Sequence, residues 1–251
     1  MNVQRYVAVL EYDGTGYRGW QRQPDARTIQ QTCEAALADV LRSEVAVIAA
    51  GRTDTGVHAR GQVVHFDSRA RLGPRELRRA WNARLPDDIW VARLSRARPD
   101  FHARFDARAR TYRYRLALGP RGPSPFVRRF AWPLDRPLDW VRVEEATAGL
   151  VGAHDFRPFG KGEPPRRAGR PTGECTVLAA AWRRSPEGRA LEITADRFLR
   201  HMVRALVGAL VRIGEGRLET DAIAAALAGR APRPHGTYAP PNGLFLWRVD
   251  Y

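Results

Sequence analysis

The chain has 251 residues, 44% of them hydrophobic, so it can form one large or two small globular domains and is not a disordered tail. Its formal net charge of +15 favours a polyanionic partner over a membrane surface, because no helix pattern has one basic and one apolar face throughout. Arginine interrupts every apolar run before it reaches the roughly 20 residues of a membrane span, and two cysteines without metal-like spacing favour a reduced, cytoplasmic protein.

The first half of the chain predicts the element order β-α-β-β-α-β. Strand-like alternation covers residues 6–12, and a capping-box pattern at Thr28 opens a helix that runs to about Arg42. The elements that follow are strands near 44–50 and 62–68, a helix over 74–85 and a strand over 89–95. We therefore expect a first domain over 1–107 that is ferredoxin-like (RRM-like) and carries an aspartate-containing loop.

The second half predicts the same order with one extra helix. Its expected elements are a strand over 111–118, a helix over 139–151, strands over 175–184 and 189–195, helices over 197–213 and 220–229, and a strand over 244–250. A loop rich in Pro, Gly and Arg covers 158–174. The expectation is an α+β protein in which a second ferredoxin-like domain over 108–251 forms a pseudo-twofold pair with the first, around a central basic cleft.

Asp54 is the first candidate catalytic residue. It lies in the stretch GRTDTG, between two predicted strands, where a turn would display its side chain. Arg52 lies two residues earlier, so an extended chain points both side chains to one face. A cation there favours the ionised carboxylate, which can then act as a nucleophile or a base.

Two other interpretations of this stretch are weaker. Asp54-Thr55-Gly56 also spells the signature of aspartic proteases, but those enzymes need two carboxylates that share a proton, and a neighbouring arginine opposes sharing. His58 and His65 suggest a metal site, but their spacing matches no recognised ligand pattern and a third ligand is missing. We expect His65, which alternates with Val64 and Phe66, on the solvent or cleft side of its strand.

Arginine is combined with aromatic or apolar residues in two further segments. In the strand from Thr111, Tyr112 and Tyr114 share one face, which is either a half-buried core face or a platform for base stacking. In the helix expected over 197–213, four basic residues recur at three- and four-residue spacing opposite the apolar face: Arg197, Arg200, His201 and Arg204. Such a face predicts an anionic partner.

Together these residues resemble the tRNA pseudouridine synthase A (TruA) family over nearly the whole chain. The segments that carry the resemblance are, in order, EYDGTGYRGWQRQ, GRTDTGVHARGQVVHF, DFHARF with RTYRYRL, HDF, FLRHMVRALVG and PPNGLFLWRVDY. The resemblance implies an isomerase that converts uridine to pseudouridine in the anticodon stem-loop of tRNA. It also implies a cytoplasmic homodimer that uses no cofactor and no metal.

The resemblance also implies roles for individual residues. Asp54 matches the essential carboxylate, Arg204 the arginine that pairs with it, and Tyr112 the tyrosine that packs on the target base and can move a proton. Substrate contacts are expected from Arg52, Leu244, His58 and Arg200. The alternative from another class is an RNA-binding protein without catalysis, built on two RRM-like units. It leaves the Arg52–Asp54 turn without a role.

Overall fold

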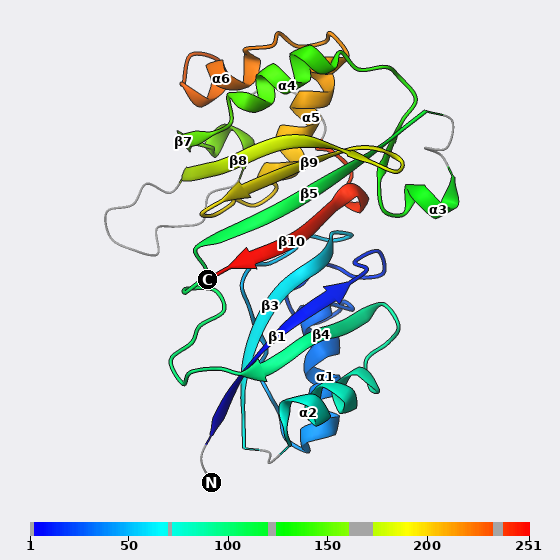
Figure 1. The fold of residues 1–251 in the computed structure, drawn as a ribbon, viewed down its shortest axis with the longest axis vertical. Coiled ribbons are helices and arrows are strands. Elements are labelled where there is room, and N and C mark those ends of the chain that lie inside the picture. Colours follow the sequence, from blue (N-terminus) through cyan, green and yellow to red (C-terminus); the bar gives the residue numbers. More distant parts are fainter. Residues whose placement is uncertain (1–2, 70–71, 120–123, 161–172, 233–237) are drawn as a thin grey trace. The chain divides into compact units, whose positions relative to one another are not determined.

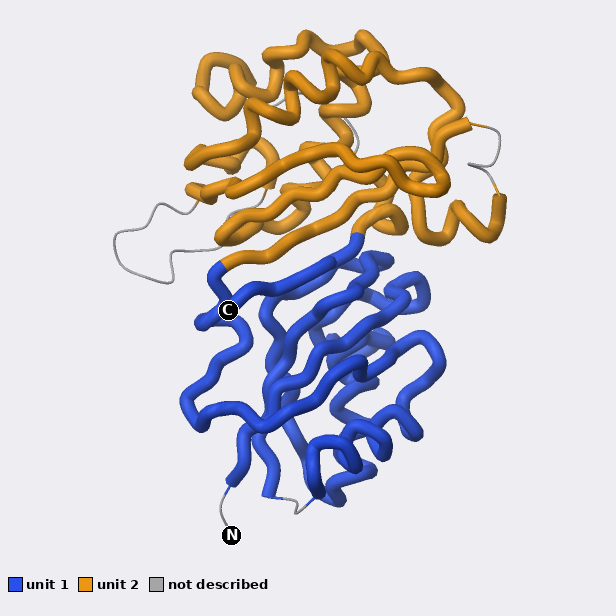
Figure 2. Tube along the Cα trace, in the orientation of Figure 1, with its two compact units in different colours: residues 1–108, 245–251 blue, residues 109–244 orange. Residues whose placement is uncertain are grey.

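The computed structural model describes residues 3–69, 72–119, 124–160, 173–232 and 238–251 (Figure 1). The chain divides into two compact units, which Figure 2 shows in different colours. Unit 1 consists of residues 1–108 and 245–251, and unit 2 of residues 109–244. Most of the basic loop expected over 158–174 lies outside the described residues.

Unit 1 is an open sheet with two helices. Its elements are β1 (Gln4–Tyr12), α1 (Ile29–Leu41), β2 (Ile48–Ala49), β3 (His58–Ser68), α2 (Pro74–Asn82), β4 (Ile89–Arg96) and most of β10 (Leu244–Asp250). The strands β4, β1 and β3 are antiparallel neighbours in that order. The short β2 pairs antiparallel with β3, and β10 pairs with β3 in parallel.

Local sequence explains both helices of unit 1. Thr28 caps α1, because its hydroxyl accepts a hydrogen bond from the backbone of Gln31, and a left-handed residue, Arg42, ends the helix. Pro74 occupies the first turn of α2, where its missing N–H costs nothing. Leu77 and Trp81 of α2 are buried. Figure 1 shows the two helices side by side, and the indole of Trp81 donates a hydrogen bond to Cys33 O at 3.1 Å.

Unit 2 consists of further strands with helices of its own. Its elements are β5 (Ala109–Leu118), α3 (Pro125–Arg128), β6 (Trp132–Leu134), α4 (Trp140–Ala148), β7 (Gly152–Asp155), the 3₁₀ turn η1 (Arg157–Phe159), β8 (Glu174–Ser185), β9 (Gly188–Ala195), α5 (Met202–Gly214), α6 (Ala222–Leu227) and the 3₁₀ turn η2 (Pro241–Gly243). The strands β5, β9, β8 and β7 are antiparallel neighbours, while β6 pairs with β5 in parallel. Helices α4, α5 and α6 gather on one side of this sheet (Figure 1).

The structure confirms the α+β class and the order β-α-β-β-α-β in unit 1. The ferredoxin-like description of the two halves stays a prediction, as does the domain boundary near residue 107. The compact units differ from the expected domains in one respect: the closing strand belongs with unit 1 from Phe245 onward, because it pairs with β3.

Helix α5 begins five residues later than the sequence predicts. His201 precedes it in a left-handed conformation, with φ of 66°, which interrupts the helical repeat. Residues Arg197 and Arg200 therefore lie before the helix, and the predicted basic face over 197–204 is wrong. Arg204 is the member of that set that lies within α5.

Candidate active site

The segment 50–57, here called the aspartate loop, connects β2 and β3 in unit 1. Its first residue, Ala50, donates a backbone hydrogen bond to Val63 O at 2.8 Å. The side-chain amide of Gln62 donates to Gly51 O at 2.8 Å. A turn follows, in which Val57 N donates to Asp54 O at 3.1 Å. Hydrogen bonds to β3 thus hold the start of the loop, its end leads into β3, and Asp54 lies in the turn between them.

A second segment, residues 12–20, packs against the aspartate loop and fixes its backbone. The hydroxyl of Tyr12 lies 2.8 Å from Thr53 Oγ1, and Trp20 N donates to Thr53 O at 3.0 Å. Gly56 N donates to Tyr17 O at 3.4 Å. Thr53 is buried, with 6% of its surface exposed. The residue directly before Asp54 is therefore held by both its side chain and its carbonyl.

Two glycines permit this close packing. A β-carbon at Gly14 would lie 2.0 Å from Val57 O, and one at Gly19 would lie 2.8 Å from Thr53 O. Gly19 also has φ of 84°, which side-chain-bearing residues rarely adopt. Both positions thus require glycine for the two segments to touch.

The side chains around Asp54 differ in exposure. Thr53 is buried, Asp54 is half-buried, and both Arg52 and Thr55 are exposed. The arrangement supports the expectation that Arg52 and Asp54 project away from the buried Thr53. Because contacts of the buried Thr53 fix the backbone, the carboxylate of Asp54 is available to a substrate without further ordering of the loop.

His58 has a different position from the one the sequence suggests. Its side chain is fully buried, its Nδ1 accepts a hydrogen bond from Gly14 N at 3.1 Å, and its ring stacks on Phe245 at 4.7 Å. These contacts join the start of β3 to segment 12–20 and to β10. His58 therefore supports the aspartate loop, and its expected contact with the substrate stays a prediction.

Unit 2 holds the other candidate residues. Tyr112, on β5, is half-buried, and its ring meets that of Phe198 edge to face at 5.0 Å. Arg204, in the first turn of α5, donates from Nε to Ala239 O at 2.7 Å. Leu244, at the start of β10, is 5% exposed. Arg200 is exposed and lies before α5.

Tyr114 organises the segment that leads to Leu244. Its hydroxyl donates a hydrogen bond to Pro240 O at 2.8 Å, and a β-carbon at Gly243 would lie 2.8 Å from its ring. Burial raises the pKa of Tyr114 well above its usual value, against the opposing charge of Arg204. Of the two open interpretations of this strand face, Tyr114 therefore fits the core, and Tyr112 remains the half-buried candidate for base contact.

The structure brings Arg52, Asp54 and His58 together in unit 1, and Tyr112, Arg204 and Leu244 lie in unit 2. Sequence reasoning missed the supporting residues Tyr12, Thr53 and Gln62. The stretch EYDGTGYRGW carried a signal for them, because its glycines are closely spaced after a strand. Among the described residues, no group of three or more His, Cys, Asp or Glu side chains is arranged to hold a metal, and no helix is long and apolar enough to cross a membrane.

Comparisons with known proteins identify the family. A family model described as tRNA pseudouridine synthase matches residues 8–106 and 146–251. A protein of Moorella thermoacetica named tRNA pseudouridine synthase A is 44% identical over 96% of this chain and 97% of its own length. Proteins of the same name from Bacteroides fragilis and Pseudothermotoga lettingae are 42% and 39% identical, over 100% and 99% of this chain and 98% and 100% of their own lengths. With the aspartate loop and its supporting segment in place, these matches show that the chain belongs to the tRNA pseudouridine synthase family.

Proposed function

We propose that this chain isomerises uridine to pseudouridine in the anticodon stem-loop of tRNA, with Asp54 as the catalytic carboxylate. The observation that carries the proposal is the aspartate loop itself. Its backbone is fixed at Thr53 by Tyr12 and Trp20, while the side chain of Asp54 stays half-exposed. A group fixed in this way is positioned before the substrate arrives, which lowers the entropic cost of the reaction.

The chemistry needs an ionised carboxylate and a movable base. The bond from N1 to C1′ breaks, the base turns, a bond from C5 to C1′ forms, and the C5 proton is lost while N1 gains one. Substrate and product contain the same atoms, so the reaction balances without a co-reactant. Asp54 serves it either by attacking C1′ or by removing a proton from C2′, and both routes require the charged form.

The other roles follow from the resemblance and from the positions of the residues. Arg204 would pair with the carboxylate and keep it charged. Tyr112 would pack on one face of the target base and move the C5 proton, and Leu244 would cover the other face. Arg52 would help to extrude the nucleotide, since a base must leave its stack to be processed. Arg200 would contact the RNA backbone.

The assembly and location are also proposals. The resemblance supports a cytoplasmic homodimer and a basic cleft between two ferredoxin-like halves. Both cysteines, Cys33 and Cys175, are buried as thiols, which fits a reducing compartment. Light scattering on the active protein tests the dimer, and a monomer that retains full activity would contradict it.

Tritium release tests the reaction. Unmodified tRNA transcripts that carry 5-tritiated uridine are incubated with the natural chain, with Asp54→Asn and with Asp87→Asn, and tRNA binding is measured in parallel. Asp87 is an exposed aspartate of the same unit, outside the aspartate loop, so it is the matched control. We expect release by the natural chain and by Asp87→Asn, and none by Asp54→Asn, which should still bind tRNA.

The other results have definite meanings. Release by Asp54→Asn would leave the activity in place and remove Asp54 from its role. No release by any of the three proteins, with tRNA still bound, would favour an RNA-binding protein without catalysis.

A further inference from the structure

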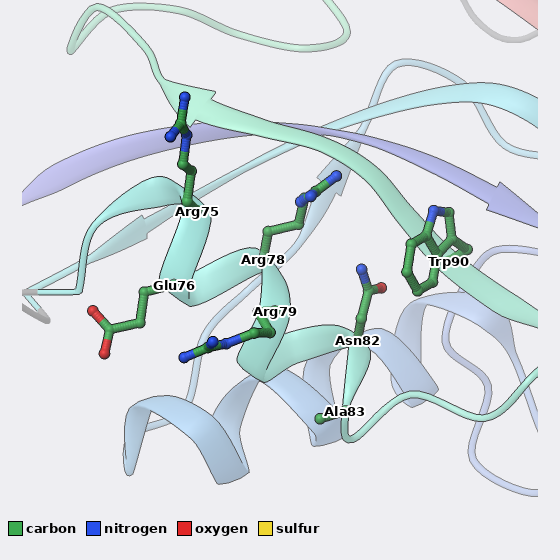
Figure 3. Close-up of a pocket in the computed structure, with 7 residues that line it drawn as sticks. All are labelled: Arg75, Glu76, Arg78, Arg79, Asn82, Ala83 and Trp90. Carbon is green, nitrogen blue, oxygen red and sulfur yellow. The ribbon is translucent and has the colours of Figure 1, made fainter.

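A groove of about 690 Å³ lies between helix α2 and strand β4 of unit 1 (Figure 3). Strand β4 ends the strand order of this unit, next to β1. The side chains that define the groove are those of Arg75, Glu76, Arg78, Arg79, Asn82 and Trp90. None of these residues belongs to the proposed catalytic set.

Two of the side chains maintain the fold. Asn82 donates to Val91 O at 3.1 Å and accepts from Val91 N at 2.8 Å, and Arg78 donates to Ala92 O at 2.8 Å. These bonds occupy backbone groups of β4 that a further strand would need. A peptide therefore cannot extend the sheet at these residues, which excludes the commonest way for an edge strand to bind a protein.

Three other groove residues, Arg75, Arg79 and Trp90, make no hydrogen bonds of this kind with the described part of the chain. Arg75 and Arg79 are exposed, one helical turn apart, and form no ion pair or hydrogen bond with any residue that the structure describes. Trp90 is 52% exposed, although burial of an indole stabilises a fold. Helix α2 is anchored instead by the buried Leu77 and Trp81. Two like charges at this spacing repel one another, so these groups are better explained by a ligand than by folding.

The chemistry of Arg75, Arg79 and Trp90 indicates the ligand. An exposed indole is a stacking surface for a base, and guanidinium groups bind phosphates. RNA offers both groups that these side chains bind, a π-face for the indole and an anionic backbone for the arginines. The net charge of +15 favours the same partner.

The position of Trp90 relates the groove to the aspartate loop. In the ladder between β1 and β4, Trp90 lies opposite Glu11. The next residue of β1 is Tyr12, whose hydroxyl contacts Thr53 beside Asp54. The groove therefore begins at the end of the sheet that supports the aspartate loop.

We propose that this groove binds the same tRNA at an unpaired nucleotide other than the target uridine. A base stacks on Trp90, and neighbouring phosphates pair with Arg75 and Arg79. This proposal rests on the proposed function, because it names a second contact with that substrate. Its test uses affinity as well as activity, so the two proposals can fail separately.

The experiment measures the dissociation constant of unmodified tRNA over a series of KCl concentrations, with tritium release measured on the same proteins. The variants are Trp90→Ala, Trp90→Phe, the double change Arg75→Gln with Arg79→Gln, and Glu76→Gln as the control of opposite charge on the same helix. We expect Trp90→Ala to weaken binding at least about fivefold, since stacking on an aromatic side chain is worth that much or more. Trp90→Phe should restore most of the affinity.

The double arginine change should reduce the slope of log affinity against log salt by about 1 to 2. Glu76→Gln should bind as tightly as the natural chain or more tightly. The kcat at saturating tRNA should stay within about twofold in all variants, while KM rises in the Trp90→Ala and double arginine proteins. Both arginines are exposed, so their change tests the proposal even where Trp90→Ala fails to fold.

An affinity within twofold of the natural chain for both groove changes, with a salt slope unchanged to within about 0.5, would overturn the proposal and favour a protein partner. If the natural chain releases no tritium but the groove variants still bind tRNA more weakly than it does, the groove is retained as an RNA site and the proposed reaction is rejected.

Discussion

The hydroxyl of Tyr12 and Oγ1 of Thr53 lie 2.8 Å apart, in a buried contact between the end of β1 and the residue before Asp54. The amide nitrogen of Gln62 lies 3.4 Å from the same Tyr12 hydroxyl and also donates to Gly51 O. Tyr12 at the end of β1 and Gln62 of β3 thus fix the aspartate loop at two points. The catalytic carboxylate we propose is positioned by buried residues.

Tyr12→Phe should lower kcat more than it raises KM, because it loosens the loop without touching the RNA. Loss of the hydrogen bond should cost about 1 kcal/mol of unfolding free energy. Tyr6→Phe is the matched control: Tyr6 lies on the same buried face of β1, and its hydroxyl donates to Leu72 O at 3.2 Å, away from the loop. Urea unfolding and initial rates of tritium release check both. Equal kcat values in the two variants would remove Tyr12 from a positioning role.

Gly19→Ala should destabilise the protein by about 1–3 kcal/mol and reduce activity. The added β-carbon would lie 2.8 Å from Thr53 O, at a residue whose φ is 84°. Gly51→Ala, in the loop itself, is the control, because its β-carbon would meet nothing within 4 Å. We expect it to stay within about 0.5 kcal/mol of the natural chain. Thermal and urea unfolding measure both, and equal effects would contradict the proposed close approach.

Unfolding free energy should fall as the pH is lowered from about 6.5 to about 4. Burial, with smaller effects from His102 and Arg5, lowers the pKa of His65 to about 4. The unfolded chain, with a histidine pKa of about 6.5, binds more protons in that window, so stability rises with pH there and levels off above it. The slope for one such group is at most about 1.4 kcal/mol per pH unit. Burial also lowers the pKa of His102, which adds in the same direction.

His65→Gln should flatten this pH dependence, because it removes the buried titrating group. Urea unfolding at several pH values between 4.5 and 7.5 measures the slope for both proteins. An unchanged slope in the variant would assign the effect to other groups.

Tyr114→Phe should lower the stability of the protein, whereas Tyr112→Phe should lower its activity. Tyr114 loses a hydrogen bond to Pro240 O, so we expect about 1 kcal/mol less unfolding free energy and a kcat within about twofold. Tyr112→Phe keeps the ring that packs on Phe198, so it should fold normally, and kcat should fall tenfold or more if its hydroxyl moves the C5 proton. Unfolding and tritium release separate the two. A normal kcat in Tyr112→Phe would restrict Tyr112 to packing on the base.

Elements with strong local signals were predictable from the sequence. The cap at Thr28, the proline at the start of α2 and the turn between β8 and β9 all lie where their residues indicate. The start of α5 was not predictable, because an unbroken helical period continues through His201, and a left-handed residue there depends on tertiary contacts. One such contact is visible at Gly160, where a β-carbon would lie 2.5 Å from that of Leu199.

The candidate site shows the same limit. The aspartate loop is visible in the motif GRTD, but the expectation that His65 faces solvent or a cleft is wrong. Its side chain is 2% exposed, because residues 101–103 cover that face of β3 and Ala103 N donates to His65 Nδ1 at 3.1 Å. Alternation along one strand reports its own two faces, and it carries no information on a distant segment that covers one of them.

The pairing of β10 with β3 makes unit 1 discontinuous in sequence. Phe245 lies opposite His58, and Leu246 opposite Ala59, at the strand start that follows the aspartate loop. On the ribosome, residues 1–108 emerge first, yet this part of β3 lacks its partner until the whole of unit 2 has been made. The supporting stack between His58 and Phe245 is therefore among the last contacts to form during synthesis, so a nascent chain released early would carry the GRTD motif without its completed support.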